Sequence, residues 1–309
     1  MPRDGRTTAL AHPVAFSVAT VLLVWAGTSV PLFGFWALLV CPVPMAILGR
    51  RHGERSMVFG TILSTAAVGL ILSPPLAAYF FLGYMPISWA FVLVAKEERT
   101  GGESFLVCAI ASLGAKLLLL AVFWVLTGRN VLLPDIGQVE LMLRELYAGL
   151  PQPQAGQDAA HQIAVLLPRM MPSLLLLMSA LDALIGYELC WLLLRRTDRP
   201  IPALPPLAEW RFPRSLLLAL LASFVMGWIW DADTWMEGAV FAVNLRLVLS
   251  VLFFLQGTSM VLWWMLRRHA RLLTWIVAAV VMIFPLTWIW LDILGVADMV
   301  LDFRARARR

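Results

Sequence analysis

Charged residues are scarce in this chain. Only 14% of the 309 residues are Asp, Glu, Lys or Arg, whereas 61% are hydrophobic. This balance lies well outside the composition of a soluble globular domain. The length would allow two soluble domains, but nearly every stretch of about 20 residues is apolar. The composition therefore predicts a polytopic membrane protein with little room for a soluble domain.

Cysteine and histidine are also sparse. The cysteines all fall within apolar runs, which favours buried free thiols over a disulfide framework. They are Cys41, Cys108 and Cys190. The histidines are scattered over connecting segments, without the spacing of zinc ligands. They are His12, His52, His161 and His269. The sequence therefore predicts neither a structural disulfide nor a metal site.

The motifs of the commoner hydrolases are missing too. The chain has no GxxxxGKS/T, no HExxH and no GxSxG, so ATP hydrolysis and the usual protease and esterase chemistries lack their residues. We therefore expect no enzymatic activity and no cofactor. The one alternative to this expectation is a metal site formed by the acidic cluster in the turn "DADTWME". Acids in such a turn are ordinarily charges in contact with water. The outer acidic cluster comprises Asp231, Asp233 and Glu237.

Nine apolar runs are separated by charged loops or prolines. They cover residues 14–30, 32–48, 57–72, 76–95, 104–127, 169–194, 214–230, 239–266 and 272–294. The pattern predicts an all-α fold, a polytopic transmembrane bundle of about eight or nine spanning helices. We expect a six-helix N-terminal bundle (1–194), a basic, proline-rich cytoplasmic joint (195–213), and C-terminal helices with a basic tail (214–309).

Arginines carry the net charge of +5, and their positions predict the orientation. The basic loops are 49–56, 96–104, 195–214 and 267–271, and they alternate with connections nearly free of Lys and Arg. A positive-inside bias then places the N-terminus and the basic loops in the cytoplasm, against anionic headgroups of the lipid bilayer rather than nucleic acid. A ninth crossing would export the tail "DFRARARR", so the side of the tail stays open.

One long loop, residues 128–168, falls on the external side. It includes an apolar helical face, so we expect an amphipathic helix between the fifth and sixth spans, lying on the membrane or capping the bundle. The face comprises Val139, Met142, Leu143, Leu146, Tyr147 and Leu150. The segment "PQPQAGQDAA" (151–160) is typical of a turn-rich linker. A simple connector and a lid over an external opening are both compatible with this pattern.

Two ionisable residues lie deep in apolar runs, where a charge needs a partner or water. Lys116 follows Ser104, where the fifth run begins. Asp182 precedes Leu194, where the sixth run ends, by the same number of residues. Both run ends are cytoplasmic, so the two charges lie at the same depth, about 18 Å from the inner boundary. On adjacent antiparallel helices they would meet. They would form a structural ion pair or a polar, proton-coupled site.

Polar residues also interrupt "AVFAVNLRLVLSVLFFLQG" (239–257). A full span remains after Arg246, which would place Arg246 and Asn244 at the outer rim, with Arg246 pairing with the acidic cluster or recognising an anion. Gln256 and Gly257 lie deeper, where a small residue beside an amide favours close helix packing with an interhelical hydrogen bond.

Four segments together resemble the YybS-like predicted membrane proteins of bacteria. They are "CPVPMAILGRRHG", "LPPLAEWRFPR", "NLRLVLSVLFFLQGTSMV" and "LGVADMVLDFRARARR". The resemblance implies a bacterial cytoplasmic-membrane protein and carries no catalytic residue. The first six helices of such proteins resemble the substrate-binding membrane subunits of energy-coupling-factor vitamin transporters, a likeness of fold that does not transfer function.

Two functions fit these features. The first is a transport-type protein that binds a small molecule in its helical bundle, without its own ATPase and with or without a membrane partner subunit. The second is a non-catalytic scaffold for envelope proteins. Transport predicts a site lined by Lys116, Asp182 or Asn244, whereas a scaffold predicts that these groups satisfy one another in a dry core.

Overall fold

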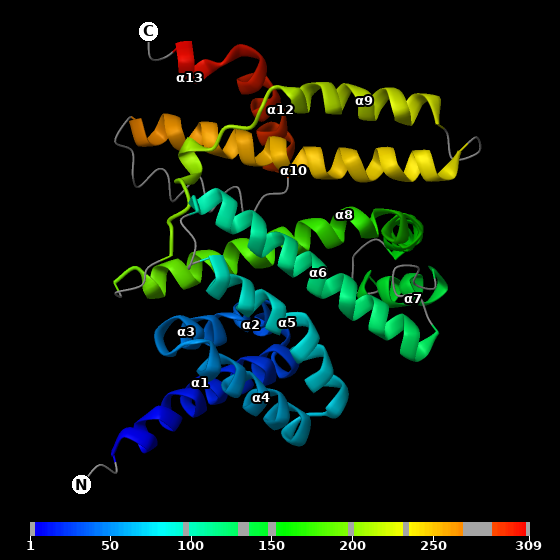
Figure 1. Cartoon of the computed structure of the whole chain (residues 1–309). Helices are drawn as coiled ribbons and strands as arrows, with labels where there is room; N and C mark the ends of the chain where they lie inside the picture. The colour runs from blue at the N-terminus through cyan, green and yellow to red at the C-terminus, as the bar shows by residue number, and fades with distance from the viewer. Residues whose placement is uncertain are drawn as a thin grey trace. The chain divides into compact units, whose positions relative to one another are not determined.

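The computed structural model describes residues 4–94, 99–128, 136–147, 153–196, 201–230, 235–267 and 286–306. These residues form helices and connections, and none of them lies in a strand. The chain divides into two units (Figure 1). The first unit comprises Met1–Leu133 and Leu175–Leu204, and the second comprises Pro134–Leu174 and Pro205–Arg309. The all-helical prediction is confirmed.

The first unit contains six complete helices and one half of a long helix. They are α1 (Asp4–Ser29), α2 (Pro31–Val40), α3 (Val43–His52), α4 (Glu54–Ile71), α5 (Pro74–Val94), α6 (Gly101–Thr127) and the C-terminal half of α8 (Pro153–Leu194). The expectation of one helix over 32–48 is wrong, because Cys41 and Pro42 form a turn between α2 and α3. Pro42 has no N–H for a helical hydrogen bond, and its ring obstructs the preceding turn.

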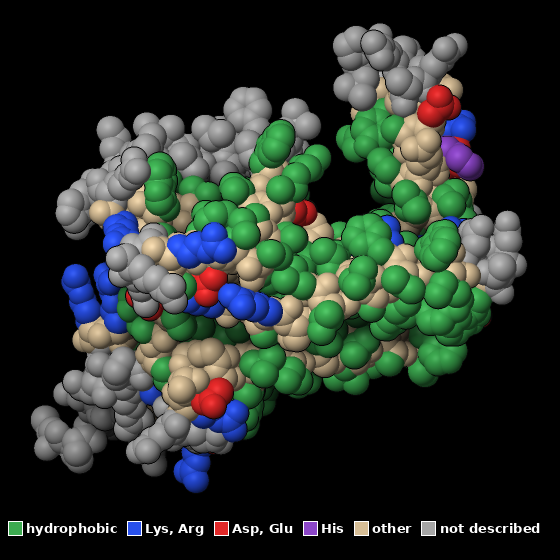
Figure 2. Space-filling model, turned by 90° about the horizontal axis from the view of Figure 1, so that it is seen from above, with side chains coloured by type: hydrophobic (Ala, Val, Ile, Leu, Met, Phe, Trp, Pro, Cys, Tyr) green, Lys and Arg blue, Asp and Glu red, His purple; other side chains and the backbone are tan. Residues whose placement is uncertain are grey.

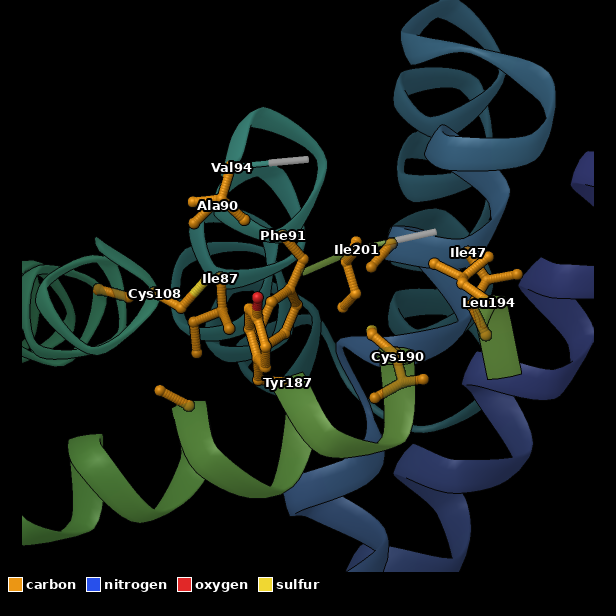
Figure 3. Packing of buried hydrophobic residues seen from close by; sticks show 14 residues of the cluster. Ile47, Ile87, Ala90, Phe91, Val94, Cys108, Tyr187, Cys190, Leu194 and Ile201 are labelled. Atoms are coloured by element: carbon orange, nitrogen blue, oxygen red, sulfur yellow. The ribbon is translucent and has the colours of Figure 1, made fainter. Parts of the chain in front are cut away.

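The core of the first unit forms where α3, α5, α6 and α8 meet. Figure 3 shows Phe91 and Tyr187 side by side in it, with Cys108 and Cys190 nearby. Gly186 permits this approach, since a Cβ there would lie 2.7 Å from the Phe91 ring. All three cysteines are buried and free, as predicted. The same helices also carry Lys116 and Asp182.

The second unit contains the remaining helices. They are α7 (Ile136–Tyr147), the N-terminal half of α8, the short 3-10 helix η1 (Leu207–Glu209), α9 (Ser215–Ile229), α10 (Met236–Arg267), α12 (Leu286–Leu301) and α13 (Phe303–Arg306). The linker predicted over 151–160 is wrong for residues 153–160, which are the first turns of α8. Pro153 is the first residue of that helix, a position where proline needs no hydrogen-bond donor.

Helix α7 is the amphipathic helix expected in the long loop. None of its side chains is buried, and Met142 and Leu146 are both 72% exposed. Its polar face contacts α8, where His161 Nδ1 lies 3.0 Å from a Glu140 carboxylate oxygen. The hydrogen bond with His161, followed by the charge of Arg144, lowers the pKa of Glu140. Tyr147, at the end of the apolar face, packs against Gly156 of α8, whereas Met142 and Leu146 remain exposed and suit a membrane surface.

Helices α10 and α12 cross closely and run in the same direction. A Cβ on Gly257 would lie 2.0 Å from the Leu291 carbonyl oxygen, and one on Gly295 would lie 2.0 Å from the Phe253 carbonyl oxygen. The contact pairs advance together along both helices, from Ser250 with Asp292 to Gln256 with Asp298. Because the two helices run in the same direction, Arg267 at the C-terminal end of α10 and Leu286 at the N-terminal end of α12 lie at opposite ends of the pair.

The run 272–294, expected as a ninth span, is described only in part. Residues 272–285 lie outside the described residues, and helix α12 (Leu286–Leu301) extends beyond the predicted end of the run. The ninth span therefore stays a prediction.

Five described helices are long and apolar enough to cross a membrane. They are Ala11–Ser29, Pro74–Val94, Gly101–Thr127, Gly156–Leu194 and Met236–Arg267. Large apolar side chains cover much of the visible surface (Figure 2), and Leu70 and Trp228 are 89% and 87% exposed. Such a surface suits lipid. A polytopic membrane fold is confirmed, while the number of eight or nine spans stays a prediction.

The unit boundary differs from the domain division expected from the sequence. Residues 134–174 belong with the C-terminal helices rather than with the N-terminal bundle. A side chain of α10 bonds to the backbone of α8 in this region, and no local sequence pattern indicates that contact.

Candidate functional site

The structure joins Lys116 on α6 to Asp182 on α8 in an ion pair. The Lys116 ammonium also donates to the Ser112 hydroxyl at 2.8 Å, and that hydroxyl lies 3.4 Å from the Asp182 carboxylate. Ser112 and Lys116 share one face of α6 because they are four residues apart. The predicted meeting of the two charges is confirmed. Ser112 completes a compact polar triad that the sequence did not single out.

Two members of the triad, Lys116 and Asp182, reach the surface of the first unit, whereas Ser112 is buried beneath them. The Lys116 side chain is 24% exposed and that of Asp182 is 14% exposed. A cation, an anion and a hydroxyl thus occur together at one place. These groups offer complementary partners to a small molecule that carries its own charges.

Asn244 has a structural contact that explains the boundary between the units. Its amide donates to the Arg169 carbonyl at 2.7 Å and accepts from the Ser173 N–H at 2.8 Å. In an unbroken helix, Ser173 N–H would bond to the Arg169 carbonyl. Pro172 opens α8 at this turn, and the amide of Asn244 inserts between the two groups. Asn244 therefore fastens α10 to α8 within the second unit.

Gln256 belongs to a buried network. Its amide oxygen accepts from the Phe212 N–H at 3.1 Å, and its nitrogen donates to Asp298 at 2.6 Å. Gln256 is only 3% exposed. The close packing and interhelical hydrogen bond expected at Gln256 and Gly257 are both present.

Arg304 completes this network, and it was missed by sequence reasoning. Its guanidinium donates to the carbonyls of Ala208 and Trp210 and to the Ser259 hydroxyl, at 3.0, 3.2 and 3.0 Å. Its Nε lies 3.4 Å from Asp298, and the two side chains are 1% and 4% exposed. The sequence signal for Arg304 was the "DFR" of the terminal motif. This motif is part of the family resemblance, but the resemblance assigned no role to its arginine. Arg304 binds the joint to α10 and α12.

Arg246 contacts α9 rather than an acid. It donates to the Ser223 carbonyl at 3.2 Å, and its guanidinium lies 4.4 Å from the centre of the Phe224 ring. No ion pair forms between Arg246 and Glu237, the one described member of the outer acidic cluster. Asp231 and Asp233 lie outside the described residues. The expected pairing of Arg246 with the acidic cluster therefore stays a prediction, because two of the three acids are not described.

Within the described part of the chain, no three His, Cys, Asp or Glu side chains are grouped so that they could hold a metal ion. The site with polar groups available for a ligand is therefore the triad of Ser112, Lys116 and Asp182. Asn244 and Gln256 instead direct both ends of their amides at protein groups. The structure thus separates one accessible polar site from a set of internal contacts.

Comparison with known proteins identifies the family. The family described as "Predicted membrane protein (DUF2232)" matches residues 18–299. The chain belongs to this family. It is also 21% identical over 301 residues to "Uncharacterized protein YybS" of Bacillus subtilis (strain 168), with 95% of each chain covered. The YybS-like resemblance is confirmed, and this DUF2232 protein has no match among solved structures.

Proposed function

We propose that this DUF2232 protein is a transport-type protein that binds a small polar molecule at the Ser112, Lys116 and Asp182 triad. The observation that carries the proposal is an ion pair within apolar helices whose two side chains remain 24% and 14% exposed. Both charged groups therefore reach the surface of the first unit, where a ligand can contact them. A ligand with both an acidic and a basic group could replace each partner of the pair.

The charge pattern narrows the ligand class. Lys116 favours a carboxylate or phosphate, Asp182 favours an ammonium, and Ser112 can donate or accept a hydrogen bond. A small zwitterion satisfies all three without leaving a net charge in the membrane. Since the sequence has no ATPase motif, movement of such a ligand would rely on an ion gradient or on a partner subunit.

The scaffold alternative is supported by the second unit. There, Asn244, Gln256 and Arg304 are satisfied by protein groups, as a dry structural core requires. A scaffold would use the surface of that unit and leave the triad without a ligand. The two functions therefore make opposite predictions about what the purified protein retains.

Native mass spectrometry of the protein in lipid nanodiscs tests the proposal. The variant Lys116→Met/Asp182→Leu removes both charges at once, so that no single buried charge remains. The matched control, Glu140→Gln/Arg144→Gln, removes an exposed ion pair on α7. We expect the wild type and the control to retain a small molecule that the triad variant lacks. Equal retention in all three proteins, or none in any, would favour the scaffold.

The proposed orientation is in the bacterial cytoplasmic membrane with the N-terminus and the joint in the cytoplasm. Arg304 contacts Ala208 and Trp210 of the joint region, so the tail should lie on the same side as the joint. Single cysteines at Arg211 and Arg306 should then react with a membrane-impermeant maleimide from one side only, and from the same side. The native cysteines are buried and give little background. Labelling from opposite sides would contradict this arrangement.

A further inference from the structure

Three aspartates on the apolar helices have different partners. Asp182 pairs with Lys116, and Asp298 lies beside Arg304. Asp292 on α12 has only the Ser250 hydroxyl, which donates to one of its carboxylate oxygens. The other oxygen is buried and has no hydrogen-bond partner in the described part of the chain. Among the residues that the structure describes, Asp292 is therefore the one of these three carboxylates without a charged partner.

Asp292 is half-buried beside a closely packed part of α10. The preceding residue, Leu291, contacts the backbone of α10 at Gly257, where even a Cβ would not fit. Ser250 lies about two turns earlier on α10. The carboxylate is thus held beside the closest approach of two helices, where water and long side chains are poorly accommodated.

The charged groups of the packed elements lie elsewhere. On α10, Arg246 turns to Phe224 on α9. Glu237 and Arg267 lie near the two ends of α10, which places them about 20 and about 26 Å from Ser250 along the helix axis. On α12, Asp298 is occupied by Gln256 and Arg304. None of these groups neutralises Asp292.

An ionised carboxylate without a counter-charge is costly in an apolar setting, because its lost hydration is not replaced by a partner. A proton from water removes this cost, since it converts the carboxylate to a neutral carboxylic acid. We propose that Asp292 is a proton-binding site. The proton resides on the oxygen that lacks a partner, while Ser250 donates to the other oxygen and fixes the orientation of the group.

This site is separate from the triad in sequence and in chemistry, and it does not depend on the proposed ligand. The triad contains a cation beside an anion. Asp292 instead changes the charge of α12 by one unit each time it binds or releases a proton. Such a group is what a membrane protein needs to respond to a proton gradient.

Infrared spectroscopy of the full chain in nanodiscs tests the proposal. At neutral pH we expect a carbonyl band of a protonated carboxylic acid in the wild type. The band should disappear in Asp292→Asn, which keeps the shape and the acceptor for Ser250. It should persist in the matched control Asp302→Asn, which alters a more exposed acid paired with Arg214. Raising the pH should remove the wild-type band.

A second variant keeps the test decisive if Asp292→Asn does not fold. Ser250→Ala removes the hydrogen bond to the carbonyl oxygen, so the band should move to higher frequency without being lost. Absence of the band from the wild type at neutral pH would overturn the proposal, as would a band that Asp292→Asn leaves unchanged. Loss of the band on adding sodium chloride at constant pH would overturn it too, and would indicate a metal-cation site.

Discussion

The two units each contain an ion pair between helical segments, and the pairs differ in accessibility. In the first unit, Lys116 and Asp182 are 24% and 14% exposed and share one serine. In the second unit, Arg304 and Asp298 are 1% and 4% exposed, and Arg304 also binds two carbonyls and a serine. The same chemistry thus serves an accessible site in one unit and an internal support in the other.

The difference lies in the surrounding hydrogen bonds. Arg304 donates from its terminal nitrogens to two backbone carbonyls and a serine, and its Nε lies 3.4 Å from Asp298 without a hydrogen bond among the described residues. Lys116 contacts only a serine and one carboxylate. The more exposed charge, which has fewer protein partners, is the better candidate for binding a ligand. The following changes test this contrast, from the largest expected effect to the smallest.

Replacing Arg304 should have the largest effect. Arg304→Met leaves Asp298 as a buried charge without a partner, which typically costs about 3–5 kcal/mol. Chemical unfolding in detergent should show this loss, while Arg306→Met, at a nearby exposed position, should show little. The double variant Arg304→Met/Asp298→Asn should recover part of the stability. If Arg304→Met unfolds at the same denaturant concentration as the wild type, the Arg304–Asp298 pair does not support the second unit as proposed.

Filling the helix crossing of the second unit should come next. Gly257→Ala places a Cβ against a carbonyl of α12, and overpacking of this kind costs about 1–3 kcal/mol. The matched control is Gly114→Ala on α6, where a Cβ would meet nothing within 4 Å. We expect a lower melting temperature for Gly257→Ala only. Equal behaviour of the two variants would show that the crossing is looser than the structure indicates.

Removing one charge of the accessible pair should cost less than removing Arg304. Lys116→Met leaves Asp182 partly exposed, so we expect a loss of about 1–3 kcal/mol, reduced by solvent screening. The paired change Lys116→Met/Asp182→Leu should restore most of the stability while abolishing ligand retention. Thermal unfolding together with native mass spectrometry separates these effects. If the single change is as costly as Arg304→Met, the two ion pairs do not differ as proposed.

The smallest effect concerns the surface pair on α7. The hydrogen bond with His161 lowers the pKa of Glu140, so the stabilisation is present above the ordinary glutamate pKa and is lost as the pH falls through the lowered value. Hydrogen exchange of α7, corrected for its intrinsic pH dependence, should rise over that acidic range. Glu140→Gln should remove this rise, and Glu145→Gln on the same helix should not. An identical profile in all three proteins would contradict the assignment.

Sequence reasoning succeeded where the answer depended on counting. Lys116 and Asp182 lie equally far from the paired ends of their runs, and antiparallel helices then bring them to one level. It failed where the answer depended on a particular neighbour. The contact of Arg246 with Phe224 was not predicted, and Arg304, which was missed, binds carbonyls that lie 94 and 96 residues away in sequence. Asn244 was placed at the rim, but its role required the opening of α8 at Pro172.

The amino-acid sequence by itself determined the membrane class, the helical fold and the common level of Lys116 and Asp182 along their helices. Hydrophobicity and helix length act residue by residue along the chain, so they can be summed without knowing the fold. Only the tertiary structure decided which polar groups are satisfied, where α10 and α12 cross, and that Asp292 has no charged partner among the described residues. Hydrogen bonds and ion pairs depend on the helices that happen to be neighbours, and that choice is made by packing rather than by local sequence.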